Sequence, residues 1–142
     1  NGWSLVRRVL KEFPGEVSKD ELHAWLQPTR LYHDVVAGLK NGGVRPKAMV
    51  HITGGGLPEN LERLFRGMGA DLEIPKWHLP GIEKLYRHVD AEDRFHTFNM
   101  GIGWVAIVAE SDVDAALAAG PGGVLIGRMV PEEGVRVRVK GE

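Results

Sequence analysis

The sequence has no cysteine, no long apolar run and no excess of charge of either sign. Its 142 residues hold 18 Lys and Arg against 19 Asp and Glu, for a formal net charge of -1. The lack of cysteine excludes disulfides, thiolate metal sites and a cysteine nucleophile. The balanced charge creates no global field that would attract nucleic acid or an acidic membrane surface, so any anion must be bound locally.

Signals for membranes and export are also missing. No apolar run approaches the roughly 18 residues that span a bilayer, and the start "NGWSLVRRVL" carries charges where a signal peptide is apolar. We therefore expect a soluble, cytoplasmic protein. With 43% hydrophobic and 26% charged residues, the composition is that of a folded domain, and the length favours a single domain over residues 1–142. Because the first residue is Asn1 and not Met, we expect a piece of a longer protein.

Apolar periodicity predicts an α/β or α+β fold, with a mixed β-sheet flanked by helices. The predicted helices cover residues 3–12, 18–27, 30–39, 58–65, 80–88 and 111–119, and the predicted strands cover 48–53, 70–74, 101–109, 123–130 and 135–140. The runs "AMVHIT" and "GIGWVAIVA" are apolar enough to predict strands buried on both faces. The last strand, "VRVRVK", alternates valines with charges and is expected at an edge of the sheet.

Local signals predict how the helices begin and which sides they bury. Ser18 and Glu21 have the spacing of a capping box. Asn1 or Ser4 is expected to cap the first helix, and Ser111 the last. The third helix is expected to bury four apolar side chains: Leu31, Val35, Val36 and Leu39.

Three consecutive glycines, Gly54 to Gly56, lie between a predicted strand and a predicted helix in "HITGGGLPEN". Glycines allow backbone N–H groups to converge, and the following helix adds free N–H donors and the positive end of its dipole, which together favour an anion or phosphate. A tight strand-to-helix turn explains the same residues. The lysine and Ser/Thr of a Walker A loop are absent, and the glycines do not have the spacing of a dinucleotide fingerprint.

Two polar stretches accompany this loop. His51 and Thr53 alternate on one face of the predicted strand, which makes His51 a candidate base, with packing as the alternative. Asn99 precedes Gly101 in "TFNMGIGWV", where it is expected either in a left-handed turn at a β-bulge or hydrogen-bonded to a ligand or to the glycine loop. Arg30 is a further candidate to supply charge to a phosphate, whereas Arg63 is better explained as a solvated surface charge.

Other catalytic arrangements find no support. The motif GxSxG does not occur, so a serine nucleophile in an elbow is not expected. The six histidines lack the close helical spacing of a zinc site, and no carboxylate cluster accompanies them, so we predict no metal site in this segment.

Four ordered stretches, "NGWSLVRRVL", "LQPTRLY", "HITGGGLPENLERLF" and "TFNMGIGWVAIV", resemble the C-terminal domain of phosphoribosylformylglycinamidine cyclo-ligase, or aminoimidazole ribonucleotide (AIR) synthetase. The resemblance covers essentially the whole chain. Two departures are local: the sequence has Asp93-Arg94 where that family commonly has Glu-Met, and Trp104 where methionine is usual.

The resemblance implies an ATP-dependent ring closure in purine biosynthesis. Formylglycinamidine ribonucleotide would be activated at its formyl amide oxygen by phosphoryl transfer, and an amidine nitrogen would close the imidazole ring with release of ADP and phosphate. An N-terminal domain, absent here, would bind most of the ATP and Mg²⁺ and form the core of a homodimer. The isolated segment is then expected to be inactive.

Carried over residue by residue, the resemblance places a set of residues at the substrate cleft or the domain junction: Thr53, Gly54, Gly55, Gly56, Asn60, Asn99, Gly101, Asn1 and Gly2. Asn60 is expected to support the glycine loop. Three relatives with the same two-domain architecture are alternatives, namely formylglycinamidine synthetase, thiamine-monophosphate kinase and selenophosphate synthetase. A non-catalytic binding module is a further one.

Overall fold

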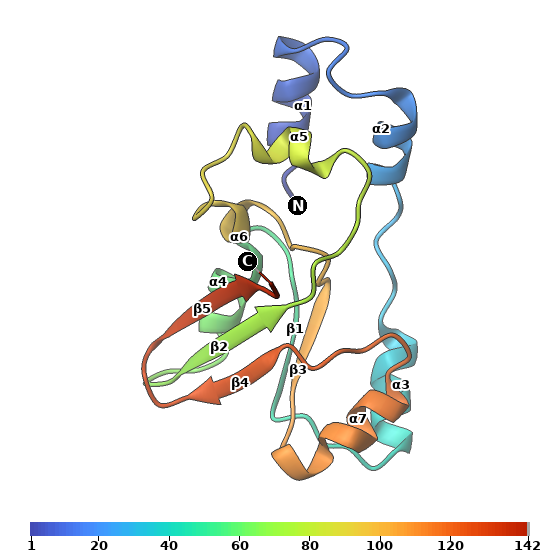
Figure 1. The fold of residues 1–142 in the computed structure, drawn as a ribbon. Coiled ribbons are helices and arrows are strands. Elements are labelled where there is room, and N and C mark those ends of the chain that lie inside the picture. Colours follow the sequence, from blue (N-terminus) through green and yellow to red (C-terminus); the bar gives the residue numbers. More distant parts are fainter. Residues whose placement is uncertain (142) are drawn as a thin grey trace.

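A computed structural model describes residues 1–141, in which helices pack around two β-sheets (Figure 1). The larger sheet has the strand order β4-β2-β5, with β4 antiparallel and β5 parallel to β2; β1 and β3 form an antiparallel pair. This confirms the α+β class with a mixed sheet.

The elements in chain order are α1 (Trp3–Glu12), α2 (Lys19–Trp25), α3 (His33–Asn41), β1 (Ala48–His51), α4 (Gly56–Glu62), β2 (Gly69–Ile74), α5 (Ile82–Tyr86), α6 (Arg94–Thr97), β3 (Trp104–Ile107), the 3₁₀ turn η1 (Glu110–Asp112), α7 (Val113–Ala119), β4 (Gly127–Val130) and β5 (Gly134–Val139).

The larger sheet is built as its sequence pattern predicts. The valines of β5 turn toward the core, and its arginines turn outward, where they pair with acidic residues of β2. Arg138 lies opposite Glu73 in the register, with 2.8 Å between Nε and Oε2. Arg136 likewise faces Asp71, and its hydrogen bond lowers the pKa of the Asp71 carboxyl. Because β5 is the outer strand of β4-β2-β5, its predicted edge position is confirmed.

The strands β1 and β3 are shorter and less buried than predicted. Met49 and His51 are exposed, and all four residues of β3 are only half-buried. Because β1 alternates half-buried with exposed residues and β3 is half-buried throughout, the predicted burial on both faces is wrong. An apolar run needs a covering layer on each side to be fully buried, and here only the side of Val50 packs against the core.

Two hydrophobic cores support the structure. The first lies between α4 and the sheets, around Leu57, Leu61 and Ile74. The second lies between α1 and α5, around Val9 and Leu85. Figure 1 shows α1, α2 and α5 together at the top of the view, away from the strands. The segment from α6 to β3 runs between the cores, and its Met100 packs against both.

Several helix ends differ from the sequence predictions. Gly2, not Asn1 or Ser4, is the N-cap of α1, and Asp112, not Ser111, is the N-cap of α7. Ser111 lies in the 3₁₀ turn η1, one residue before the N-cap of α7. The capping box of α2 is confirmed, with both of its hydrogen bonds present.

The third helix begins later than predicted. It starts at His33, so Leu31 lies before it and is 74% exposed, and Val36 is exposed as well. Only Leu39 of the predicted buried side is fully buried. The short helix α6 was not predicted, because four residues are too few to show a helical period. No helix among residues 1–141 is long and apolar enough to cross a membrane.

Glu21 joins α2 to α5. Its carboxylate lies 2.7 Å from Lys84 Nζ, and both side chains are largely covered by protein. The hydrogen bond from Lys84, followed by that from the Ser18 backbone, lowers the pKa of Glu21 from 4.5 to about 2. A carboxyl whose pKa is lower in the folded state stabilises the fold above its unfolded pKa, and loses that contribution as the pH falls through the folded pKa.

We predict that Glu21→Gln lowers the melting temperature at pH 7, and that its difference from the parent chain shrinks between pH 4.5 and about 2. The matched control is Glu12→Gln, since Glu12 is an exposed residue near the end of α1. Thermal unfolding followed by circular dichroism across this pH range measures both. A difference in melting temperature between Glu21→Gln and the parent chain that stays constant down to pH 2 would contradict the lowered pKa of Glu21.

Candidate functional site

The turn between β1 and α4 needs two of its three glycines. Gly55 is the N-cap of α4 with φ 88°, and Gly56 has φ 58°, both in the left-handed region that glycine favours. A Cβ on Gly56 would also lie 1.8 Å from the carbonyl oxygen of Phe95 and 2.9 Å from that of Phe98. Close backbone packing against the α6 segment therefore requires glycine at position 56. Helix α4 accordingly starts at Gly56, two residues before the predicted Pro58.

Gly54 is different, because the fold does not require it. Its φ is not in the positive range, and a Cβ at this position would meet no atom within 4 Å. Gly54 is also exposed. The tight-turn explanation therefore accounts for Gly55 and Gly56 but leaves the first glycine, with open space over its backbone, unexplained.

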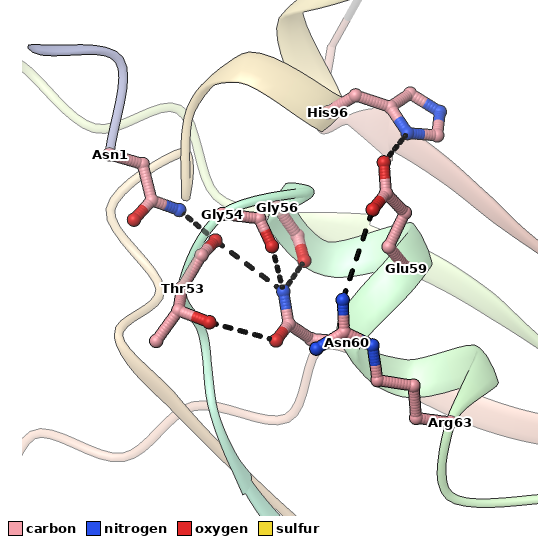
Figure 2. Close-up of polar contacts among 8 residues, drawn as sticks. All are labelled: Asn1, Thr53, Gly54, Gly56, Glu59, Asn60, Arg63 and His96. Carbon is pink, nitrogen blue, oxygen red and sulfur yellow. Dashed lines mark hydrogen bonds and ion pairs between the residues drawn. The ribbon is translucent and has the colours of Figure 1, made fainter.

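The Asn60 side chain fills the inside of the loop (Figure 2). It is 2% exposed, and its Nδ2 donates to the carbonyl oxygens of Gly56 at 2.7 Å and Gly54 at 3.0 Å, with a longer contact of 3.4 Å to that of Thr53. Its Oδ1 accepts from the Thr53 hydroxyl at 3.2 Å. The predicted support of the glycine loop by Asn60 is thus a direct hydrogen-bonded contact.

This arrangement determines where the backbone donors point. In a trans peptide unit the C=O and the following N–H point in opposite directions. Because the carbonyls of Thr53 and Gly54 turn inward to Asn60, the N–H groups of Gly54 and Gly55 turn outward. Neither N–H is bonded to an acceptor within residues 1–141. Two adjacent outward N–H groups, with open space at Gly54 and the Glu59 side chain beside Gly55, form a concave donor surface for an anion.

The charges next to the loop are mixed. Glu59, in the first turn of α4, lies against Gly55, at 3.5 Å from His96 Nδ1 and 3.9 Å from an Arg63 nitrogen. Figure 2 shows its carboxylate between the His96 ring and the Arg63 guanidinium. These exposed pairs contribute little to stability. Their effect is local, because the Glu59 carboxylate opposes an anion at Gly55 and the Arg63 guanidinium partly neutralises that carboxylate.

The chain's first residue reaches the same loop. Asn1 Nδ2 donates a hydrogen bond to the carbonyl oxygen of Thr53. Gly2 follows with φ 77°, and a Cβ there would lie 2.6 Å from the ring of Phe98. The predicted junction residues therefore hold the start of α1 against both the loop and the α6 segment.

Asn99 and Gly101 belong to a turn of their own. Asn99 Oδ1 accepts from the N–H of Gly101 at 3.0 Å, and no hydrogen bond joins Asn99 to the glycine loop. The predicted left-handed Asn99 is wrong, since Met100, with φ 53°, and Gly101, with φ 82°, take up that conformation. The neighbouring Phe98, together with Phe95, places its carbonyl next to Gly56 of the loop. Sequence spacing gives no sign of this contact, or of the one between Glu59 and His96.

His51 and Thr53 lie on the same exposed side of the strand, as predicted. Burial alternates from exposed His51 through buried Ile52 to exposed Thr53. The His51 ring lies 5.9 Å from that of Tyr32, which comes from the segment before α3. Within residues 1–141, no three His, Asp or Glu side chains come together as a metal site.

Comparison with known families identifies one match. The model for AIR synthase related protein, C-terminal domain, matches residues 1–140. This covers nearly the whole chain, including the glycine loop and the Asn99 turn.

Curated relatives agree with this family. Phosphoribosylformylglycinamidine cyclo-ligase of Prochlorococcus marinus is 42% identical over 128 residues, which is 82% of this chain and 37% of the relative. The enzymes of the same name from Thermoanaerobacter sp. and Synechococcus sp. are each 39% identical, over 94% and 95% of this chain and 44% of their own lengths. The chain thus spans less than half the length of these relatives.

The three glycines should respond differently to substitution. We predict that Gly56→Ala lowers the free energy of unfolding by roughly 2–5 kcal/mol, through backbone strain and the clash with Phe95. Gly54→Ala should change it by less than about 1 kcal/mol. Urea unfolding followed by tryptophan fluorescence compares the two, and equal losses would show that the fold requires Gly54 after all.

Asn60 and Asn99 provide a matched pair, because the first uses its amide as a donor and the second uses only its oxygen. Asn60→Asp replaces the donor by a carboxylate oxygen facing backbone carbonyls, and should cost about 3 kcal/mol of unfolding free energy or more. Asn99→Asp keeps its acceptor and should stay within about 0.5 kcal/mol of the parent chain. The same urea experiment measures both, and similar losses in the two variants would contradict the donor role of Asn60.

Proposed function

This chain belongs to the AIR synthase related protein, C-terminal domain family, and on that premise we propose that it forms the substrate-binding half of an ATP-dependent cyclo-ligase. The reaction closes the imidazole ring of formylglycinamidine ribonucleotide, giving aminoimidazole ribonucleotide, ADP and phosphate in purine biosynthesis. One observation carries the proposal: Asn60 turns the loop carbonyls inward, so that the N–H groups of Gly54 and Gly55 turn outward, with open space at Gly54.

The anion at the loop is proposed to be the phosphate of the ribonucleotide. The loop has no lysine, and Glu59 lies beside it. A phosphoryl group in transfer needs cations and metal to neutralise its developing charge. A phosphate ester that stays bound through the reaction needs only fixed donors, which two backbone N–H groups supply without reorganisation.

The other residues of the site hold the loop and the substrate in place. Asn60 and Asn1 fix the loop through its carbonyls, and Gly56 fixes it against the α6 segment. His51 lies at the start of the same exposed face, two residues before Thr53, where it can accept a proton from the substrate's amidine. The chain's part of the reaction is thus to bind the ribonucleotide end and hold the reacting end in place.

ATP and Mg²⁺ are proposed to bind mainly outside this chain, in the part of the cyclo-ligase that precedes it. The described residues bring no three metal-ligating side chains together, and the curated relatives are more than twice as long as the segment they share with the chain. When bound, ATP supplies the phosphoryl group that activates the formyl amide oxygen. A homodimer is proposed for the longer protein.

Domain replacement tests this division of labour. In a chimera, the chain replaces the matching segment of the Thermoanaerobacter relative, and ADP release is measured with formylglycinamidine ribonucleotide. We predict turnover by the chimera and none by the isolated chain. A folded chimera without turnover would favour a non-catalytic binding module, and turnover by the isolated chain would contradict the proposed division.

Two substitutions in the chimera should act in opposite directions on substrate binding. Gly54→Val fills the open space and should raise the KM for the ribonucleotide by roughly tenfold or more, since it blocks both N–H donors. Glu59→Gln removes a negative charge beside Gly55 and should lower the KM by roughly twofold to fivefold. Initial rates at varied substrate concentration measure both. Unchanged KM values in two folded variants would exclude an anion at this loop.

A further inference from the structure

An aromatic surface lies beside the glycine loop, and two of its three residues, Tyr32 and Trp104, have no part in the function proposed so far. It consists of Tyr32, His51 and Trp104. His51 and Trp104 are directly opposite each other in the β1–β3 register, so their side chains share one face. The Tyr32 ring stacks on that of Trp104 at 6.1 Å between centroids and 15° between planes, and lies 5.9 Å from that of His51.

Close contacts hold the aromatic side chains of this surface in place. The hydroxyl of Tyr32 approaches the backbone of Gly103 so closely that a Cβ there would lie 2.0 Å from it. Gly103 does not have a positive φ, so the approach of Tyr32 is the reason that glycine is needed. The arrangement holds Tyr32 flat against Trp104, although Tyr32 precedes the first residue of α3.

A cation lies at the rim of the same surface. The Arg30 guanidinium is 5.8 Å from the centre of the Tyr32 ring and donates to the carbonyl oxygen of Pro121 at 3.1 Å. No carboxylate of the described residues pairs with it. Arg30, Tyr32 and Trp104 also line one groove of about 1150 Å³, whose lining does not include His51 or the glycine loop.

The aromatic surface and the loop are adjacent. His51 and Thr53 point to the same side of an extended segment, so their side chains are about 7 Å apart along it. Gly54 follows directly. A ligand with a phosphate at the loop and a flat group one sugar away can therefore contact both.

We infer that the surface of Tyr32, His51 and Trp104 binds the planar, π-conjugated head group of a ribonucleotide whose phosphate occupies the glycine loop. This inference rests on the proposed function for the position of the phosphate. Stacking on aromatic side chains recognises flat bases and heterocycles, and Arg30 supplies a hydrogen-bond donor to an acceptor atom on the head group. The site thereby selects ribonucleotides with a planar, conjugated head group over ribose phosphate, which has none.

The test compares aminoimidazole ribonucleotide with ribose phosphate, which lacks the ring, as ligands of the full 142-residue chain. Titration calorimetry gives both affinities. We expect the ring-bearing ligand to bind roughly tenfold more tightly. Tyr32→Ala and Trp104→Ala should remove this preference and leave the affinity for ribose phosphate unchanged. Tyr32→Phe and Trp104→Phe should keep it.

Two controls separate this inference from the proposed function. Met49→Ala alters the same exposed face of β1 away from the loop, and should have no effect on either ligand. Gly54→Val should weaken both ligands equally. Gly54→Val can weaken the binding of both ligands while the alanine variants still prefer the ring-bearing ligand; the aromatic site is then wrong and the phosphate site at the loop is supported. Gly54→Val can also leave both affinities unchanged while the alanine variants lose the preference for the ring-bearing ligand; the phosphate site at the loop is then wrong. Equal affinities of the parent chain for the two ligands would overturn the inference.

Discussion

The site depends on the buried amide of Asn60. A single Nδ2 group donates to the backbone carbonyls of Thr53, Gly54 and Gly56 in a partly buried turn. Planarity of the peptide unit then turns the N–H groups of Gly54 and Gly55 to the opposite side. One interaction inside the loop thus both stabilises the turn and creates the donor surface outside it.

The two cores determine where this loop is held. The core around α4 carries Asn60 on the helix that follows the glycines, and the core of α1 and α5 supports Phe98. The backbone at Phe95 and Phe98 comes within contact of Gly56, so the segment between the cores forms the back wall of the loop. Asn1 adds a contact from the start of the chain. The loop is therefore where distant parts of the sequence meet, and its open side is the one with Gly54.

Local patterns predicted the local structure well. The capping box at Ser18, the edge strand of alternating valines and arginines, and the strand–glycine–helix order each depend on residues close in sequence. The split into two sheets and the exposed face of β1 were missed, because apolar content does not reveal whether a second layer covers a strand. The inward role of Asn60 came from family resemblance, whereas the fit of Gly56 against Phe95 depends on chain packing that no motif encodes. The roles of the site residues toward ligands stay predictions.

The central claim is that Gly54 and Gly55 present free N–H groups to a phosphate. The most direct measurement is a titration of the isotope-labelled chain with inorganic phosphate, following its amide resonances by NMR. The account predicts saturable downfield shifts of the Gly54 and Gly55 amides, while those of Gly122 and Gly123, in the exposed turn after α7, stay in place. Shifts of similar size at both glycine turns, or none at Gly54 and Gly55, would contradict it.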